Sequence, residues 1–230
     1  MAFQQMPQPN SPRNAPGSGP LSRRLMWPAG AFLMGTLFVY NSIGAPADPA
    51  SQSRPAVAAT ARAGGIRSLP ASVPALARSE PKRLSIPEIG VDAPFVPLEI
   101  GPAGQLNAPP GNNNNLVGWF KGGATPGERG ASIVAGHVDT KTGPAVFMLL
   151  SRLKKSSTIK VTRADGVVAT FKVDSVETFS KAQFPNDQVY ADTPDAQLRV
   201  ITCGGPYNRA AKDYEDNVVV FAHLASSGRA

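Results

Sequence analysis

The chain has 230 residues, enough for one domain with flanking segments or for two small domains. Its single cysteine excludes a disulfide-stapled scaffold, and one Cys with two His cannot supply the ligand set of a zinc finger. The 22 Gly show no Gly-X-Y period, which excludes collagen, and the 23 Pro indicate that part of the chain lies outside a packed core. Of the net charge of +7, residues 1–80 carry +5, so the remainder lacks the basic surface of a nucleic-acid-binding domain.

An uncharged apolar stretch follows the N-terminal residues. Residues 1–24 are rich in Gln, Pro, Asn and Ser and predict a disordered tail, whereas residues 25–45 predict a transmembrane helix about 31 Å long. Arg residues precede this helix and no acidic residue occurs before Asp48, so the positive-inside rule predicts a single-pass membrane protein with a cytoplasmic N-terminus and an extracellular remainder. A cleaved signal peptide is the alternative, because Ala45-Pro46-Ala47 resembles a cleavage site.

Residues 46–80 consist mainly of Ala, Pro, Ser, Gly and Arg without a helical or alternating period, and they predict a disordered spacer. We expect a folded domain over residues 81–226 and a short tail over residues 227–230. In the folded part, short apolar runs broken by Gly, Pro and Asn predict an all-β barrel or sandwich, with one short helix over 145–153. The predicted strands are 83–86, 95–98, 132–135, 158–162, 167–173, 198–202 and 217–222, with a hairpin turn at 164–166.

Three residues of the folded part are candidates for chemistry. Cys203 follows the apolar run 198–202 and precedes Gly204-Gly205-Pro206, which must end the strand, so it is a candidate nucleophile at a strand end. His137 follows the strand at 132–135 and is a candidate acid and base. Arg209 follows in the next loop, and its guanidinium suits a developing oxyanion. Each alone also fits a structural role: a buried Cys, a packed His or a solvated Arg.

Several fragments resemble a known family when taken together. They are Ala135-Gly136-His137-Val138-Asp139, Gly143-Pro144-Ala145-Val146-Phe147, Ile201-Thr202-Cys203-Gly204-Gly205 and Tyr214-Glu215-Asp216-Asn217-Val218-Val219-Val220. Their order resembles a sortase, most like the actinobacterial class F type, with class E next, over roughly residues 82–224. The sortase motif Thr-Leu-x-Thr-Cys is matched only at Thr202 and Cys203, and no Arg occurs over 214–224, where the family's essential Arg usually lies, so Arg209 is the best match.

The resemblance implies a closed β-barrel of about eight strands and a cysteine transpeptidase. Such an enzyme cleaves a Leu-Pro-x-Thr-Gly-like signal between Thr and Gly through a thioester on Cys203 and passes the acyl group to an amine. His137 would be the acid and base, Arg209 the oxyanion ligand, and Thr202 and Asp139 supporting residues. The implied partners are proteins bearing the signal, an amine acceptor such as a cell-wall precursor, and the membrane through residues 25–45.

Two other functions use the same sequence features. The first is a cysteine endopeptidase, in which water resolves the thioester. The second is a non-catalytic envelope domain that binds partners and needs no reactive thiol. No metal-ligand cluster, phosphate-binding loop or dinucleotide fingerprint occurs in the sequence, so we expect neither a metal nor a cofactor.

Overall fold

The computed structural model describes residues 73–229. The predicted tail at 1–24, the predicted transmembrane segment at 25–45 and the predicted spacer up to residue 72 lie outside the described residues. Among residues 73–229, no helix combines the length and the apolar character needed to cross a bilayer.

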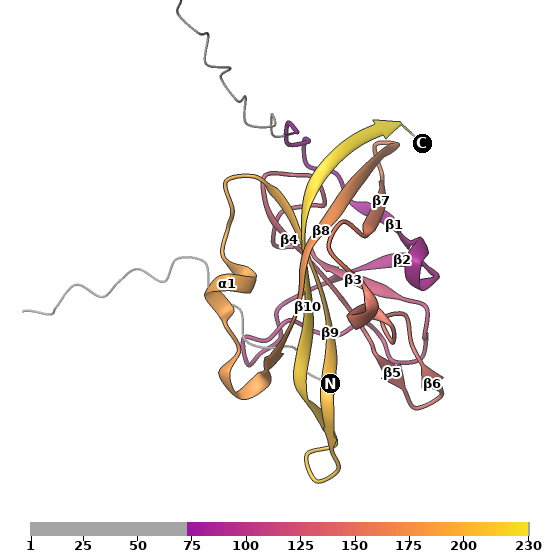
Figure 1. Ribbon diagram of the computed structural model, residues 1–230, viewed down its shortest axis with the longest axis vertical. Coiled ribbons are helices and arrows are strands. Elements are labelled where there is room, and N and C mark those ends of the chain that lie inside the picture. Colours follow the sequence, from indigo (N-terminus) through magenta and orange to yellow (C-terminus); the bar gives the residue numbers. More distant parts are fainter. Residues whose placement is uncertain (1–72, 230) are drawn as a thin grey trace, which may run out of the picture. The chain divides into compact units, whose positions relative to one another are not determined.

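Within the described residues, eight strands close into a barrel in the order β1-β2-β3-β4-β9-β10-β8-β7 (Figure 1). These strands are β1 (Pro81–Ile86), β2 (Val91–Leu98), β3 (Val117–Phe120), β4 (Gly130–Gly136), β7 (Thr158–Arg163), β8 (Val167–Ser180), β9 (Ala196–Asn208) and β10 (Asp213–Arg229). The expected all-β closed barrel is therefore confirmed. The remaining elements are the paired β5 (Asp139–Thr140) and β6 (Gly143–Pro144), the 3-10 turns η1 (Pro87–Ile89), η2 (Leu150–Arg152) and η3 (Lys181–Gln183), and the helix α1 (Asn186–Tyr190).

Two hydrophobic clusters lie on opposite faces of the barrel wall. Alternate residues of the strands, such as Val134 in β4 and Val200 in β9, fill the interior. Their neighbours Ile133 and Ile201 belong to a second cluster, which α1 covers through Val189. Figure 1 shows α1 beside β10, on the outside of the barrel. Odd-numbered residues at these positions of β4 and β9 therefore face outward, toward the α1 side.

Two strand pairings position the candidate residues. β4 and β9 run parallel, with Gly130 opposite Ala196 and Ala135 opposite Ile201. The prediction that Gly204-Gly205-Pro206 ends the strand is wrong: β9 continues to Asn208 because its last residues pair with β10, so Cys203 lies within β9, next to the point where β4 ends. β9 and β10 form a long antiparallel hairpin whose turn projects beyond the other strands (Figure 1).

The structure differs from the sequence prediction over residues 145–153. This segment forms turns and then η2 instead of one continuous helix. The cause is that its first amides bond to other segments: Val146 N donates to Asn114 O at 2.8 Å, and Phe147 N donates to His137 O at 3.0 Å. Long-range bonds therefore replace the local bonds that a helix requires.

Both ends of the folded part extend past the predicted limits. Residues 73–80, which the sequence assigns to the spacer, contact the barrel: Leu76 N donates to Gly127 O at 2.7 Å, and the Arg163 guanidinium donates to Ala77 O. At the other end, β10 continues through Arg229 because its last residues pair with the first residues of β8, as in Arg229 opposite Val167. Strand pairing therefore orders most of the predicted tail.

Candidate active site

The parallel pairing of β4 and β9 brings His137 and Cys203 to neighbouring positions. Ala135 pairs with Ile201, and two further residues along each strand lead to His137 and Cys203. The Thr202 hydroxyl donates to the Gly136 carbonyl at 2.9 Å, which holds the strands together between these two pairs. Because side chains alternate along a strand, Cys203 falls on the same outward face of β9 as Ile201, and His137 directly follows the end of β4. Two residues that are 66 positions apart in the sequence thus become neighbours.

Cys203 is a free thiol with an exposed fraction of 1%. Lys181, the first residue of η3, places Nζ 3.5 Å from Cys203 Sγ, and the same ammonium lies 2.8 Å from Asp213 Oδ2 in β10. Burial raises the pKa of the Cys203 thiol, Lys181 acts to lower that pKa, and Asp213 acts to raise it further. The nucleophile candidate is therefore covered by an ion pair whose cation touches the sulfur.

The His137 ring has one engaged nitrogen and one unengaged nitrogen. Nε2 lies 2.7 Å from the Pro109 carbonyl oxygen, and a carbonyl only accepts, so Nε2 carries a proton. Nδ1 is buried and has no partner among the described residues. The proton that this ring exchanges is therefore the one on Nδ1. The backbone at this point is fixed because the His137 carbonyl accepts from Phe147 N at 3.0 Å.

The two supporting candidates have structural contacts in the same region. Thr202 joins β9 to β4 through its bond to Gly136 O. Asp139, in β5, accepts a hydrogen bond from the Tyr214 hydroxyl of β10. This hydrogen bond is the main reason why the pKa of Tyr214 rises to about 12. Asp139 therefore ties the β5–β6 hairpin to the strand that pairs with Cys203.

Arg209 is the candidate that the structure does not bring to the others. It is exposed in the turn between β9 and β10, and within residues 73–229 it forms no hydrogen bond or ion pair. The cation that contacts Cys203 is Lys181 instead. Sequence reasoning missed Lys181 because the segment from Ser180 to Phe184 matches no motif that would distinguish this lysine.

Asn217 is a second residue that sequence reasoning did not single out. It lies directly opposite Cys203 in the β9–β10 pairing, so the two side chains share one face of the sheet. Its exposed fraction is 0%, and neither atom of its amide has a partner among the described residues. An unbonded buried amide is costly to the fold, and here it stands next to the thiol.

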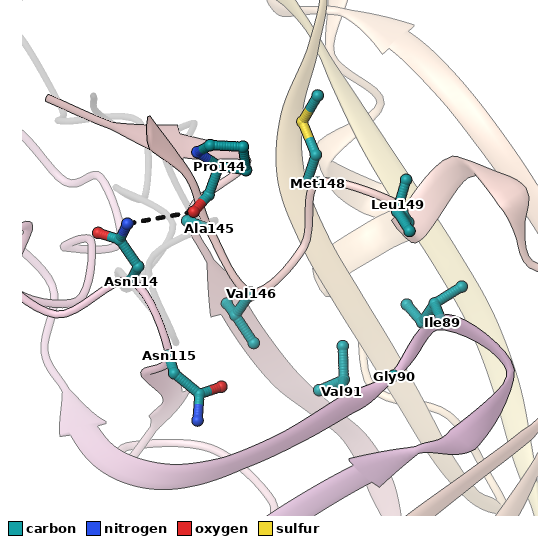
Figure 2. A pocket seen from close by; sticks show the side chains of 10 residues that line it. All are labelled: Ile89, Gly90, Val91, Asn114, Asn115, Pro144, Ala145, Val146, Met148 and Leu149. Atoms are coloured by element: carbon teal, nitrogen blue, oxygen red, sulfur yellow. Dashed lines mark hydrogen bonds between the residues drawn. The ribbon is translucent and has the colours of Figure 1, made fainter. Parts of the chain in front are cut away.

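Two depressions lie near these residues. The first, of about 390 Å³, adjoins the ion pair over Cys203 and is lined by Lys181, Asp213, Tyr214 and neighbouring residues. The second has a volume of about 420 Å³, and neither depression has Cys203 or His137 in its lining. Figure 2 shows the second between the turn at Ile89–Val91 and the segment from Pro144 to Leu149, where Asn114 Nδ2 donates to the Pro144 carbonyl at 3.1 Å. The first depression therefore reaches the Lys181–Asp213 ion pair, and Cys203 is buried beneath it in contact with Lys181.

One family model and several solved structures are similar to this chain. Residues 84–225 match the family model described as the Sortase domain. Sortase A of Listeria monocytogenes is 16% identical, with a TM-score of 0.51 over 66% of this chain and 91% of that chain, which supports a shared fold. Sortase A of Corynebacterium diphtheriae is 21% identical, with a TM-score of 0.49 over 65% of this chain and 62% of that chain. A search of curated proteins finds no significant match.

Proposed function

Because this chain belongs to the sortase family and is a cysteine transpeptidase, we propose that it cleaves a Leu-Pro-x-Thr-Gly-like signal between Thr and Gly and transfers the acyl group to an amine. The observation that supports this proposal is the parallel pairing of β4 and β9, in which Thr202 Oγ1 donates to Gly136 O, one residue before Cys203 and one residue before His137. A thiol activated by an imidazole is a pair that supports nucleophilic acyl transfer.

The first half of the reaction forms the thioester. The Cys203 thiolate attacks the carbonyl carbon of the signal's Thr, and the carbonyl electron pair moves onto oxygen. When this intermediate collapses, the C–N bond to Gly breaks and His137 gives its Nδ1 proton to the leaving amine. Nε2 keeps its proton throughout, because the Pro109 carbonyl holds it.

The second half resolves the thioester. An acceptor amine gives its proton to Nδ1 of His137 and attacks the acyl carbon, and the C–S bond breaks to return the thiolate. In both halves hydrogen-bond donors must stabilise the oxyanion, and a cation is a strong donor for this purpose. The family resemblance points to Arg209 for this role. Among the described residues, Lys181 is the cation that contacts the sulfur.

We extend the proposal to the chain's class, location and partners. The motifs around Cys203 and Asn217 support a class F or class E sortase. The apolar stretch at 25–45, preceded by Arg residues, supports an anchor in the cell membrane with the barrel outside. An anchored enzyme meets exported substrates at the same membrane, which raises the effective concentration of the two partners. Its partners are then proteins bearing the signal and an amine of a wall precursor or another protein.

The test is incubation of the full chain, in mild detergent, with a peptide library built around Leu-Pro-x-Thr-Gly and with triglycine as the amine. Mass spectrometry should find the library peptide cut after Thr and joined to triglycine, and the Cys203→Ala variant should give no such product. Hydrolysis as the sole outcome, with or without triglycine, would identify an endopeptidase. No turnover, together with a thiol that reacts only after unfolding, would favour a binding domain.

A further inference from the structure

Lys181 is held beside the nucleophile by the local structure of its own segment. β8 ends at Ser180, and η3 begins at Lys181. The Ser180 hydroxyl accepts from Ala182 N at 3.3 Å and caps this turn, which fixes the backbone at Lys181. The Lys181 side chain is 12% exposed and ends 3.5 Å from Cys203 Sγ. A lysine at this depth is not an ordinary solvated surface residue.

Asp213 holds the same ammonium from the opposite side. Its Oδ2 lies 2.8 Å from Lys181 Nζ, and its backbone is fixed where β10 begins, opposite Asn208. The ammonium therefore stands between a carboxylate and a thiol. An ammonium has three donor hydrogens, so it can keep its bond to Asp213 while it donates to a second anion.

We propose that Lys181 is the cationic residue of the transpeptidation reaction, which stabilises the Cys203 thiolate and then the oxyanion, with Asp213 as its positioning residue. This inference rests on the proposed function and assigns the oxyanion role that the family resemblance gives to Arg209. When Sγ bonds to the carbonyl carbon, the oxyanion is only two bonds from the sulfur. A donor that contacts Sγ is then close enough to follow the charge onto that oxygen.

Lys181 does not transfer a proton in either half of the reaction. The thiolate pair forms the C–S bond, the carbonyl pair moves to oxygen, and Lys181 donates a hydrogen bond without losing its proton. On collapse, the oxygen pair re-forms the carbonyl, the C–N bond breaks, and His137 supplies the proton to the amine. Lys181 is thus an electrostatic partner in both halves of the reaction.

Three ionisable side chains interact electrostatically with the thiol. They are Lys181 from η3 and Asp213 and Tyr214 from β10; the Tyr214 hydroxyl in turn donates to Asp139 of β5. Burial raises the pKa of the thiol, and Lys181 opposes that effect. Loss of the Lys181 charge therefore raises the thiol pKa further, whereas loss of the Asp213 charge lowers it.

The experiment measures the rate of Cys203 alkylation by iodoacetamide against pH, using the full chain in detergent. Lys181→Met should move the midpoint of this profile to higher pH, Lys181→Arg should keep it close to wild type, and Asp213→Asn should move it to lower pH. Lys212→Met is the matched control, because it removes the same charge from the exposed β9–β10 turn and should leave the midpoint unchanged. A purely structural lysine would change thermal stability without moving this midpoint.

Transpeptidation supplies the second measurement. Lys181→Met should lower kcat by about 10²–10³-fold with a smaller effect on KM, as expected for a lost oxyanion donor. Lys181→Arg should recover part of this loss, and Arg209→Ala should lose less than Lys181→Met. The proposal would be overturned by a larger loss of kcat in Arg209→Ala than in Lys181→Met. It would also be overturned by identical alkylation midpoints in wild type and Lys181→Met. If Lys181→Met does not fold, the alkylation profiles of Asp213→Asn and Lys181→Arg still test whether the ion pair controls the pKa of the thiol.

The alkylation profile needs no substrate, so the two proposals fail separately. If the wild-type chain makes no amine-linked product but the midpoint shifts as expected, the proposed function fails and the contact between Lys181 and the thiolate stands. If Cys203→Ala abolishes the product while Lys181→Met changes neither midpoint nor kcat, the function stands and the role of Lys181 is rejected.

Discussion

Gly136 is a position at which a single added methyl group should disturb the site. It is the last residue of β4, directly before His137. A Cβ at Gly136 would lie 2.5 Å from Phe147 Cδ2 and 2.9 Å from Val146 Cγ1, whereas carbon atoms normally approach to about 3.5–4.0 Å. The Phe147 ring is fully buried, so it must shift by about 1 Å into a packed core. Overpacking of this kind costs about 1–3 kcal/mol of unfolding free energy.

The displacement of Phe147 should also move the backbone of His137, because Phe147 N donates to the His137 carbonyl. A displacement of about 1 Å at a catalytic group can lower turnover about 10²-fold. We therefore expect Gly136→Ala to melt about 2–4 °C lower for each kcal/mol lost and to have a reduced kcat. Gly111→Ala is the matched control, since no atom lies within 4 Å of the added Cβ. If Gly136→Ala matches Gly111→Ala in both thermal melting and turnover, the packing argument is refuted.

Three further predictions concern the neighbouring strands. Thr202→Val should lower the free energy of unfolding by about 0.5–1.5 kcal/mol in urea titrations, because the bond to Gly136 O is lost, and Thr202→Ser should restore it. Asn217→Val should raise that free energy by about 1–3 kcal/mol, because it removes two buried polar atoms without partners; a loss of stability would contradict this reading. The third prediction concerns pH: burial raises the pKa of Cys203 above its ordinary value of 9.0, so above that pH the unfolded chain binds fewer protons than the native one. Stability should therefore fall as pH rises past 9.0, by at most about 1.4 kcal/mol per pH unit, and Cys203→Ala should remove this part of the slope in urea titrations at several pH values.

The predicted strands depend on local patterns, and this explains their success. Alternating or apolar runs such as 167–173 and 198–202 lie within β8 and β9, and the turn at 164–166 joins β7 to β8. Gly166 adopts a φ of +77°, the left-handed conformation that this hairpin turn requires. The strand β3 was not predicted because Val117–Phe120 is short and has two neighbours with different pairing directions.

The site was less accessible to sequence reasoning, because its geometry depends on pairing between distant segments. His137 can be placed at a strand end from the local sequence, whereas Gly204-Gly205-Pro206 wrongly predicts a strand end after Cys203, because pairing with β10 carries β9 on to Asn208. That their strands run parallel and adjacent is set by closure of the barrel, and only the family resemblance indicated it. The contact between Lys181 and Cys203 is more difficult to predict from the sequence, since the position of Lys181 depends on where β8 ends and on how η3 turns toward β10.

The near-complete burial of the thiol also determines how a substrate must enter. A carbonyl carbon has to reach Sγ, so part of the cover over Cys203 must move. The cover includes the Lys181–Asp213 ion pair, whose side chains are 12% and 29% exposed and which lines the depression of about 390 Å³. Moving the Lys181 and Asp213 side chains together keeps their ion pair, whereas moving a barrel strand would break several buried hydrogen bonds. Displacement of side chains is therefore the cheaper route to the sulfur, and it keeps the ammonium beside the carbonyl oxygen on which negative charge develops.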